Sequence, residues 1–271
     1  MKPFLKWAGG KYKLVNKIKE QLPKSGRLIE PFCGAGAVFL NTDFDQYLIC
    51  DSNEDLINLY QYIQKHGSDF IDYVEKNYFD GGRYSSEASF YEQRNKFNNT
   101  KDVKEKSALF IYLNRHCFNG LCRYNSKGGF NVPFGRYKTP YFPREELEYF
   151  YKQSKRNTVF KCQDFKDTMD AANKGDVVYA DPPYAPVSIT SSFTSYSTKG
   201  FVEDDQKALI AKAKELQEQG IPVLISNSDT EWTEKNYNLP KVKITNFEVR
   251  RLIAADRSKR NMAGEILALF K

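Results

Sequence analysis

The tetrapeptide Asp181-Pro182-Pro183-Tyr184 is the part of this sequence whose chemistry is most evident. It follows the apolar run 177–180, which predicts a buried strand, so it would lie at the edge where open α/β sheets bind ligands. An ordinary strand-ending turn can use the same residue types, since proline ends strands and aspartate favours turns. Two consecutive prolines are a costly way to build a common turn, and this favours a functional interpretation.

Methyl transfer to an exocyclic aromatic amine is the reaction that these residues suit. Such a nitrogen is a poor nucleophile because its lone pair is delocalised, and it must become pyramidal as it attacks a sulfonium methyl group. The Asp181 carboxylate and the Pro182 carbonyl would accept its hydrogens and stabilise the developing positive charge. The Tyr184 ring offers a face on which the target base can stack. We therefore predict that Asp181, Pro182 and Tyr184 are catalytic and that no metal is needed.

A second element is the segment Glu30-Pro31-Phe32-Cys33-Gly34-Ala35-Gly36, which follows another predicted strand. Glycines at a strand-to-helix turn let a ligand approach the backbone closely. The dinucleotide fingerprint requires Gly or Ala at its third position, which here is Phe39. Asp51 ends the next predicted strand, where it can accept hydrogen bonds from ribose hydroxyls or simply begin a helix.

Two further motifs suggest a phosphate-binding loop and a metal site, but neither has the full set of residues that such a site requires. Phe4-Leu5-Lys6-Trp7-Ala8-Gly9-Gly10-Lys11 contains Gly-Gly-Lys but lacks the first glycine of a phosphate-binding loop, and Tyr12 replaces its Ser or Thr. His116, Cys117 and Cys122 lack a fourth metal ligand at suitable spacing. We interpret these last three as packed side chains.

The positive charge of the chain is localised. The 271 residues include 41 Lys and Arg against 34 Asp and Glu, and residues 106–144, the acid-free segment, contain neither Asp nor Glu. Aromatic residues alternate with its basic ones, which are Lys106, Arg115, Arg123, Lys127, Arg136, Lys138 and Arg144. Positive charge attracts phosphate, and flat rings stack on bases or insert between them. A solvated basic face over an aromatic core would show the same composition.

Composition excludes several classes of protein. Hydrophobic residues make up 41% and charged residues 28%, as in globular proteins, and no apolar run approaches the roughly 20 residues that cross a bilayer. The opening residues Met1-Lys2-Pro3-Phe4 precede no apolar segment, so no secretory signal is expected. The scattered cysteines favour free thiols. We expect a cytoplasmic protein with no membrane segment and no disulfide framework.

The elements that must position these motifs alternate between strands and helices, which is typical of an α/β fold with a largely parallel sheet. Strands are predicted at 27–30, 46–50, 158–162, 176–180, 221–226 and 264–270. Helices are predicted after an Asn53 N-cap with Leu56, Ile57, Tyr60 and Ile63 on one stripe, over 68–115 with the longest at 103–115, and over 203–219.

A β-hairpin is predicted over 121–134, because Ser126-Lys127-Gly128-Gly129 forms a turn between two β-prone runs. The simplest architecture is one α/β domain made of residues 1–54 and 145–271. An insertion at 55–144 interrupts it and contains the acid-free segment.

Taken together, these residues resemble the DNA adenine methylase family of adenine-N6 methyltransferases, over nearly the whole chain. Besides the motifs already given, the resemblance runs through Leu113-Asn114-Arg115, Phe118-Asn119-Gly120-Leu121-Cys122-Arg123-Tyr124-Asn125, Phe130-Asn131-Val132-Pro133-Phe134-Gly135-Arg136-Tyr137 and Leu224-Ile225-Ser226-Asn227. Many amino-methyltransferases share the catalytic tetrapeptide, whereas the hairpin sequence is far more particular. The segment 253–260 departs from the glycine- and serine-containing loop usual in the family.

The resemblance implies a Rossmann-like methyltransferase sheet with an inserted helical and β-hairpin target-recognition domain at 55–144. It implies S-adenosylmethionine as methyl donor and adenine in double-stranded GATC as target, flipped out of the stack for reaction. The implied donor-binding residues are Trp7, Lys11, Phe32, Gly34, Gly36, Asp51, Asp164, Phe165 and Asp181. Asp164 would flank the donor's adenine with Phe165, or merely cap a helix.

The resemblance also implies how DNA is read. Arg forks onto guanine O6 and N7, and apolar side chains suit the thymine methyl. The implied roles are Lys6 at the first guanine, Arg123 at the guanine paired with the last cytosine, Leu121 and Pro133 at the thymine methyl, Phe118 as a wedge beside the flipped adenine with Asn119 next to it, and Arg136 and Tyr137 at the far end of the hairpin.

Other interpretations keep part of this chemistry. The chain could modify DNA as the partner of a restriction nuclease, or act on cytosine N4, RNA or a protein amide. Asp rather than Asn at position 181, together with the hairpin, disfavours the protein substrate. Phe39 disfavours a nicotinamide-dependent oxidoreductase, and a non-catalytic DNA-binding module leaves the tetrapeptide unexplained. We expect double-stranded DNA as partner, no metal, and a monomer in solution.

Overall fold

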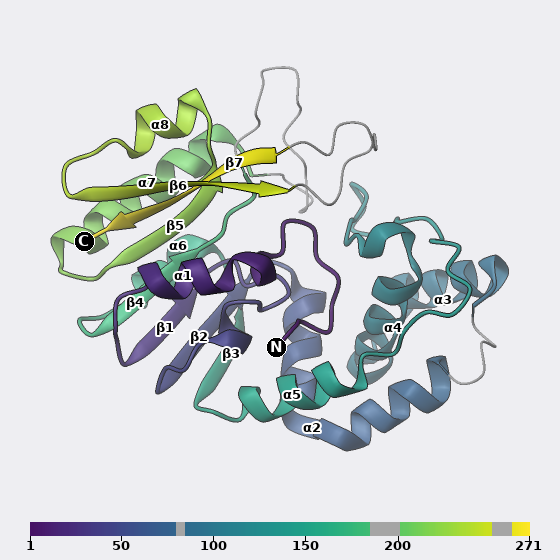
Figure 1. Ribbon diagram of the computed structural model, residues 1–271. Helices are drawn as coiled ribbons and strands as arrows, with labels where there is room; N and C mark the ends of the chain where they lie inside the picture. Colours follow the sequence, from purple (N-terminus) through teal and green to yellow (C-terminus); the bar gives the residue numbers. More distant parts are fainter. Residues whose placement is uncertain (80–84, 185–200, 251–261) are drawn as a thin grey trace.

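A computed structural model describes residues 1–79, 85–184, 201–250 and 262–271. At its centre lies a seven-stranded sheet in the order β3-β2-β1-β4-β5-β7-β6 (Figure 1). The strands are β1 (Arg27–Glu30), β2 (Gln46–Asp51), β3 (Thr158–Cys162), β4 (Asp176–Ala180), β5 (Val223–Ser228), β6 (Val242–Arg250) and β7 (Met262–Phe270). Neighbours from β3 to β5 pair in parallel, whereas β7 pairs antiparallel with β5 and β6. The predicted α/β fold with a largely parallel sheet is confirmed.

The central strands are buried on both faces, which explains their continuous apolar runs. Successive side chains point to opposite faces, so Leu28 and Ile29 of β1 enter two different apolar clusters. The Leu28 face packs against α1 (Val15–Gln21), α2 (Glu54–Tyr78) and α5 (Arg144–Ser154). The Ile29 face packs against α6 (Phe165–Asp170), α7 (Glu203–Glu218) and α8 (Glu231–Tyr237). The remaining helices, α3 (Glu87–Asn99) and α4 (Val103–His116), lie beside α2 at one side of the sheet (Figure 1).

Helix α2 begins as the sequence predicts. The Asn53 side chain accepts a hydrogen bond from Leu56 N at 3.1 Å and caps the helix. The helix continues to Tyr78 and kinks at Gly67, whose φ is +51°. A Cβ at Gly67 would lie only 2.5 Å from the Tyr151 ring, so the close approach of α5 requires glycine there.

The predicted hairpin at 121–134 is only partly present. The chain turns at the predicted place, where Asn125 N donates to Gly129 O at 2.9 Å, but its two arms share only the isolated bridge Tyr124↔Phe130. Pro133 explains the difference, because it has no N–H with which to continue the pairing to the first arm. Asn98 of α3 bonds the other edge of the second arm: its side chain accepts from Phe130 N at 2.8 Å and donates to Phe130 O at 3.2 Å. The second arm is therefore bonded to α3 on the edge that faces away from the first arm. We call residues 117–138 the bridged loop.

Two other strand predictions need correction. Strand β5 begins at Val223 rather than residue 221, because Ile221 N donates to Leu216 O at 2.9 Å and thereby completes the end of α7. Pro222, which has no N–H, follows. Strand β6 was not predicted, although it pairs with β7 along nine residues. The segment 253–260 lies outside the described residues. Among the described helices, none has the length and apolarity needed to cross a membrane.

Candidate active site

A pocket of about 590 Å³ opens at the carboxyl ends of β1, β2 and β4. Its wall combines the N-terminal segment, the turn after β1, the end of β2 and the tetrapeptide after β4. It brings together most residues predicted for donor binding and catalysis, namely Trp7, Lys11, Phe32, Gly34, Asp51, Asp181, Pro182 and Tyr184. Because parallel strands end at a common edge, four segments distant in sequence meet there.

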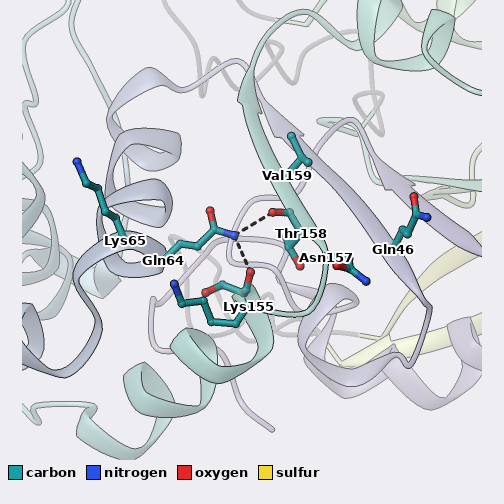
Figure 2. A pocket seen from close by; sticks show the side chains of 8 residues that line it. Gln46, Gln64, Lys65, Lys155, Asn157, Thr158 and Val159 are labelled. Atoms are coloured by element: carbon teal, nitrogen blue, oxygen red, sulfur yellow. Dashed lines mark hydrogen bonds between the residues drawn. The ribbon is translucent and has the colours of Figure 1, made fainter.

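A second hollow, of about 660 Å³, lies near the amino ends of β2 and β3, at the opposite edge of the sheet (Figure 2). Figure 2 shows Gln64 reaching across it, and Gln64 Nε2 donates to the Ser154 and Thr158 carbonyls at 2.6 and 2.9 Å. The lining contains no carboxylate, imidazole or thiol. We therefore do not assign the chemistry to this hollow.

The carboxylate of Asp181 is held by two side chains from other elements. Ser226 of β5 donates its hydroxyl to Asp181 Oδ1 at 2.8 Å, and Lys11 Nζ lies 3.0 Å from the same oxygen. Lys11 also donates to Gly9 O at 2.7 Å, and the Tyr179 hydroxyl lies 3.1 Å from Ser226 Oγ. Both contacts to Asp181 among the described residues are on Oδ1.

The Tyr184 side chain is held at its hydroxyl and over the face of its ring. Its hydroxyl donates to Glu265 Oε2 of β7 at 2.9 Å, and Lys11 Nζ lies 4.5 Å from the ring centroid. Burial, followed by the charges of Asp181 and Glu265, raises the pKa of Tyr184 well above its ordinary value. Tyr184 is therefore a neutral phenol whose ring forms part of the pocket wall.

Asp51 organises the turn after β1. Its carboxylate accepts from Gly34 N and from Asn53 N, each at 3.0 Å. Burial raises the pKa of Asp51, and these backbone hydrogen bonds oppose that change. Gly34 has a φ of +46°, and a Cβ there would lie 2.7 Å from the indole nitrogen of Trp7. Glycine is thus required for Trp7 to pack on this turn.

Glu30, which closes β1, is a pocket residue that the sequence analysis did not assign to the site. Its side chain is 2% exposed, and its Oε1 has no hydrogen-bond partner among the described residues. Burial, with a further contribution from Asp181, raises the pKa of Glu30 to about 8. The sequence signal that could have identified Glu30 is an acidic residue at the carboxyl end of an apolar strand.

Three residues expected at the donor site do not line the pocket. Gly36 instead forms part of the turn after β1, where its φ is +71°. Asp164 caps α6 by accepting from Lys166 N at 2.9 Å, which was the alternative considered for it. Phe165 stacks behind the pocket residue Phe32, with ring centroids 5.4 Å apart. Phe165 therefore supports the wall without forming it.

The residues expected to contact DNA lie on or near the bridged loop. Phe118 is 50% exposed, and its N–H donates to Pro133 O at 2.8 Å. Lys6 Nζ lies 4.2 Å from the centroid of the Tyr137 ring. The exposed members of the set are Phe118, Asn119, Arg123, Pro133 and Arg136, whereas Lys6, Leu121 and Tyr137 are half-buried. The structure thus gathers the predicted set around one surface loop.

The Arg123 guanidinium is oriented by Asn131 of the opposite arm. Nε donates to Asn131 Oδ1 at 2.8 Å, and Nη2 donates to Asn131 O at 3.3 Å. These bonds hold a planar fork on an otherwise exposed side chain.

Other basic residues of the acid-free segment bind groups of the protein itself. Arg115 is 8% exposed and donates to the carbonyls of Tyr141 at 2.9 Å and Phe4 at 3.3 Å. Arg144 pairs with two acids of α2, and Lys106 pairs with Asp55 at 2.9 Å. The exposed basic residues are Arg123, Lys127, Arg136 and Lys138. The exposed basic surface is therefore formed by only part of the basic residues of the acid-free segment.

His116, Cys117 and Cys122 have the contacts of packed side chains. The His116 ring stacks on Tyr112 at 4.0 Å, and its Nδ1 lies 2.8 Å from the Tyr112 carbonyl. Burial lowers the pKa of His116 to about 4 and raises those of Cys117 and Cys122 to about 12.

Comparison with known proteins agrees with this geometry. Residues 7–253 match the model of the D12 class N6 adenine-specific DNA methyltransferase family. The chain is 48% identical over 269 residues to the DNA adenine methylase of Serratia marcescens, covering 99% of this chain and 98% of that protein. It is 46% identical over 268 residues to the DNA adenine methylase of Escherichia coli strain K12, covering 99% and 95%.

A solved structure, precorrin 8W decarboxylase from Methanobacterium thermoautotrophicum, aligns at a TM-score of 0.37 and 10% identity, over 96% of this chain and 89% of that one. This likeness is too weak to bear on fold or function. The family match and the full-length relatives are decisive: this chain belongs to the D12 class of N6 adenine-specific DNA methyltransferases.

Proposed function

We propose that this enzyme transfers the methyl group of S-adenosylmethionine to N6 of adenine in double-stranded GATC, after the adenine has left the base stack. The observation that carries the proposal is the tetrapeptide at the carboxyl end of β4, with Asp181 held by Lys11 and Ser226 at the wall of the pocket. Membership of an adenine-specific family limits the target to adenine in DNA.

The pocket suits S-adenosylmethionine by its hydrogen-bond acceptors and its aromatic walls. The buried Glu30 oxygen, which has no partner in the described part of the chain, suits the donor's ammonium group, and the Asp51 carboxylate suits its ribose hydroxyls. Trp7 and Phe32 provide aromatic walls, and the bare Cα of Gly34 leaves the turn open to close approach. When bound, the donor supplies an electrophilic sulfonium methyl group.

Asp181 and Pro182 orient the amino group of the adenine. Lys11 and Ser226 both bind Asp181 Oδ1, which leaves Oδ2 to accept an amino hydrogen. The Pro182 carbonyl accepts the other hydrogen, so the nitrogen lone pair is directed at the methyl group. The Tyr184 ring stacks on the base. A carboxylate fixed before reaction stabilises the positive charge on nitrogen without reorganisation.

We propose residues 1–54 and 145–271 as the catalytic domain and 55–144 as the inserted target-recognition domain, which reads DNA through the bridged loop. Arg123 and Lys6 would read the guanines, Leu121 and Pro133 the thymine methyl, and Phe118 would fill the space of the flipped base, as the resemblance implies. Asp55 ties this loop to the pocket edge, because it accepts from the Tyr124 hydroxyl at 2.8 Å and pairs with Lys106 at 2.9 Å.

The test is methylation of DNA in cells that lack adenine methylation and express the wild-type chain or Asp181→Ala. Their DNA is digested with one nuclease that cuts only methylated GATC and one that cuts only unmethylated GATC. We expect wild-type DNA to resist the second and Asp181→Ala DNA to resist the first. Adenine methylation at other sequences would overturn the GATC assignment, and unmethylated DNA from cells with folded wild-type protein would overturn the function.

A further inference from the structure

Gln206 occupies a position where helix α7 otherwise places apolar residues. The buried stripe of this helix contains Leu209, Ala213 and Leu216, and Gln206 lies on the same stripe with an exposed fraction of 0%. An amide that is removed from water destabilises the fold unless protein groups satisfy its hydrogen bonds. A buried glutamine in this position therefore needs hydrogen-bond partners within the protein.

Both ends of the Gln206 amide are bonded. Its Nε2 donates to Pro183 O at 2.7 Å, and its Oε1 accepts from Asn227 Nδ2 of β5 at 3.1 Å. Asn227 is itself buried, and its Nδ2 lies 3.2 Å from the Tyr237 hydroxyl of α8. A buried polar network from three elements thus ends on one backbone carbonyl, that of the second proline of the catalytic tetrapeptide.

This carbonyl controls the geometry between Asp181 and Tyr184. Proline rings fix φ at Pro182 and Pro183, so at Pro183 the only backbone rotation left is ψ. That rotation sets the direction of the Pro183 carbonyl. A hydrogen bond from Gln206 to this oxygen therefore fixes ψ, and with it the position of Tyr184 relative to Asp181.

We infer that Gln206 is a positioning residue for methyl transfer: it fixes the Pro183 peptide so that Asp181, Pro182 and Tyr184 present their groups to the adenine together. This inference rests on the proposed function. Gln206 touches neither donor nor base, so its loss lowers the rate of the chemical step and leaves donor and DNA affinity nearly unchanged. A misplacement of reacting groups by roughly 1 Å can reduce a rate about a hundredfold.

Two substitutions separate positioning from packing. Gln206→Met keeps the length of the side chain and removes both bonds. Gln206→Glu keeps an acceptor for Asn227, but its carboxylate cannot donate to Pro183 O. The neutral carboxylic acid can donate, and burial favours that neutral form. The neighbouring Tyr237 has a pKa raised to about 12 by burial, so it remains protonated throughout the test.

The measurement is the single-turnover rate of methyl transfer on a GATC duplex, with donor and DNA both saturating, from pH 6 to 8.5. We expect Gln206→Met to be slower than wild type by about tenfold to a hundredfold at every pH. We expect Gln206→Glu to be equally slow at pH 8.5 and to recover relative to wild type as the pH falls. Calorimetric dissociation constants for donor and DNA should stay within about threefold of wild type.

Gln217→Met is the matched control, because Gln217 of the same helix donates its amide to Lys241 O at 2.8 Å, away from the tetrapeptide. It should keep the wild-type rate. Folded Gln206 variants with wild-type rates would overturn the inference. The proposed function would still stand in that case, because it depends on the activity of the wild-type protein. Loss of folded structure in both Gln206 variants at every pH would also overturn it, since the residue would then serve folding alone.

Discussion

Lys11 Nζ lies 3.0 Å from Asp181 Oδ1, which joins the N-terminal segment to the carboxylate that follows β4. The two side chains are 5% and 20% exposed, so water screens their attraction only partly. Removing one partner of a buried pair leaves the other charge uncompensated, at a cost of about 3–5 kcal/mol. The N-terminal segment is therefore part of the wall of the candidate active site.

We expect Asp181→Ala to lose methyl transfer while keeping DNA binding, since the surface assigned to DNA lies on the bridged loop. Losing one charged acceptor should slow the chemical step by about 10² to 10³, the scale of an oxyanion-hole donor. Asp181→Asn is the control for shape, because it keeps the contact with Ser226 but not the charge beside Lys11. A single-turnover rate within tenfold of wild type for Asp181→Ala would contradict the assignment.

Glu30 should make stability depend on pH. Its ordinary pKa is 4.5, and the folded value is about 8. Below pH 4.5 the carboxyl is protonated in both states. Between 4.5 and 8 the unfolded chain loses the proton while the folded chain keeps it, so the free energy of unfolding falls as pH rises. Relative to wild type, Glu30→Gln should gain stability over this window, as urea unfolding at pH 5, 6.5 and 8 would measure.

The same carboxylate should link donor affinity to pH. If the donor's ammonium binds ionised Glu30, wild-type affinity for S-adenosylmethionine rises towards pH 8 and then levels, because less free energy is needed to ionise the group. Glu30→Gln should bind the donor more weakly, and its affinity for the donor should not show this rise with pH. Parallel pH profiles for the two proteins, measured by calorimetry, would show that Glu30 does not meet the ammonium.

Local sequence signals predicted much of this site. The tetrapeptide follows a buried strand, and Asn53 caps α2, because strand burial and N-caps depend on neighbouring residues. The burial of Arg115 depends instead on the Tyr141 and Phe4 carbonyls, which only the folded chain brings near. The hairpin prediction was wrong in detail for a local reason that the sequence does contain: Pro133 has no N–H with which to extend the pairing of the two arms.

Composition was a poorer guide than the fold to which basic residues are exposed. An acid-free stretch of sequence cannot show that Arg144 meets Glu75 of α2 across the structure. Likewise, that Glu30 Oε1 has no partner within the described ranges is visible only when its surroundings are known. The sequence thus predicts which motifs belong together, whereas the partners of individual charges require the fold.

We expect Phe118 to fill the stack when the adenine leaves it. The ring is half exposed on the bridged loop, and unstacking costs a few kcal/mol that an inserted ring offsets. With 2-aminopurine at the target position, wild type should raise the fluorescence strongly and Phe118→Ala should raise it less. Tyr141→Ala is a control, since Tyr141 is an aromatic residue of similar exposure, 55%, outside this loop. Unchanged fluorescence with normal methylation by wild type would contradict base flipping.

Arg123 and Lys138 are both exposed basic residues of the bridged loop, but we expect them to act differently on DNA. Asn131 holds the Arg123 fork in a fixed plane, as base reading requires, whereas Lys138 carries a flexible point charge. Arg123→Ala should cost about 1–3 kcal/mol on GATC and relax discrimination at one base pair. Lys138→Ala should weaken all sequences alike and reduce the salt dependence of binding by about one phosphate contact.

The measurement that separates them is kcat/KM for GATC and each single-base variant, at several salt concentrations, for both substitutions. Asn131→Ala is a third variant for the same measurement. It leaves the Arg123 guanidinium in place but removes the Oδ1 acceptor that orients it, so it should lose part of the discrimination at the same base pair. If Arg123→Ala slows every sequence by one common factor, Arg123 neutralises phosphate, as Lys138 is expected to do. The base-reading role assigned to the bridged loop would then be wrong at this position.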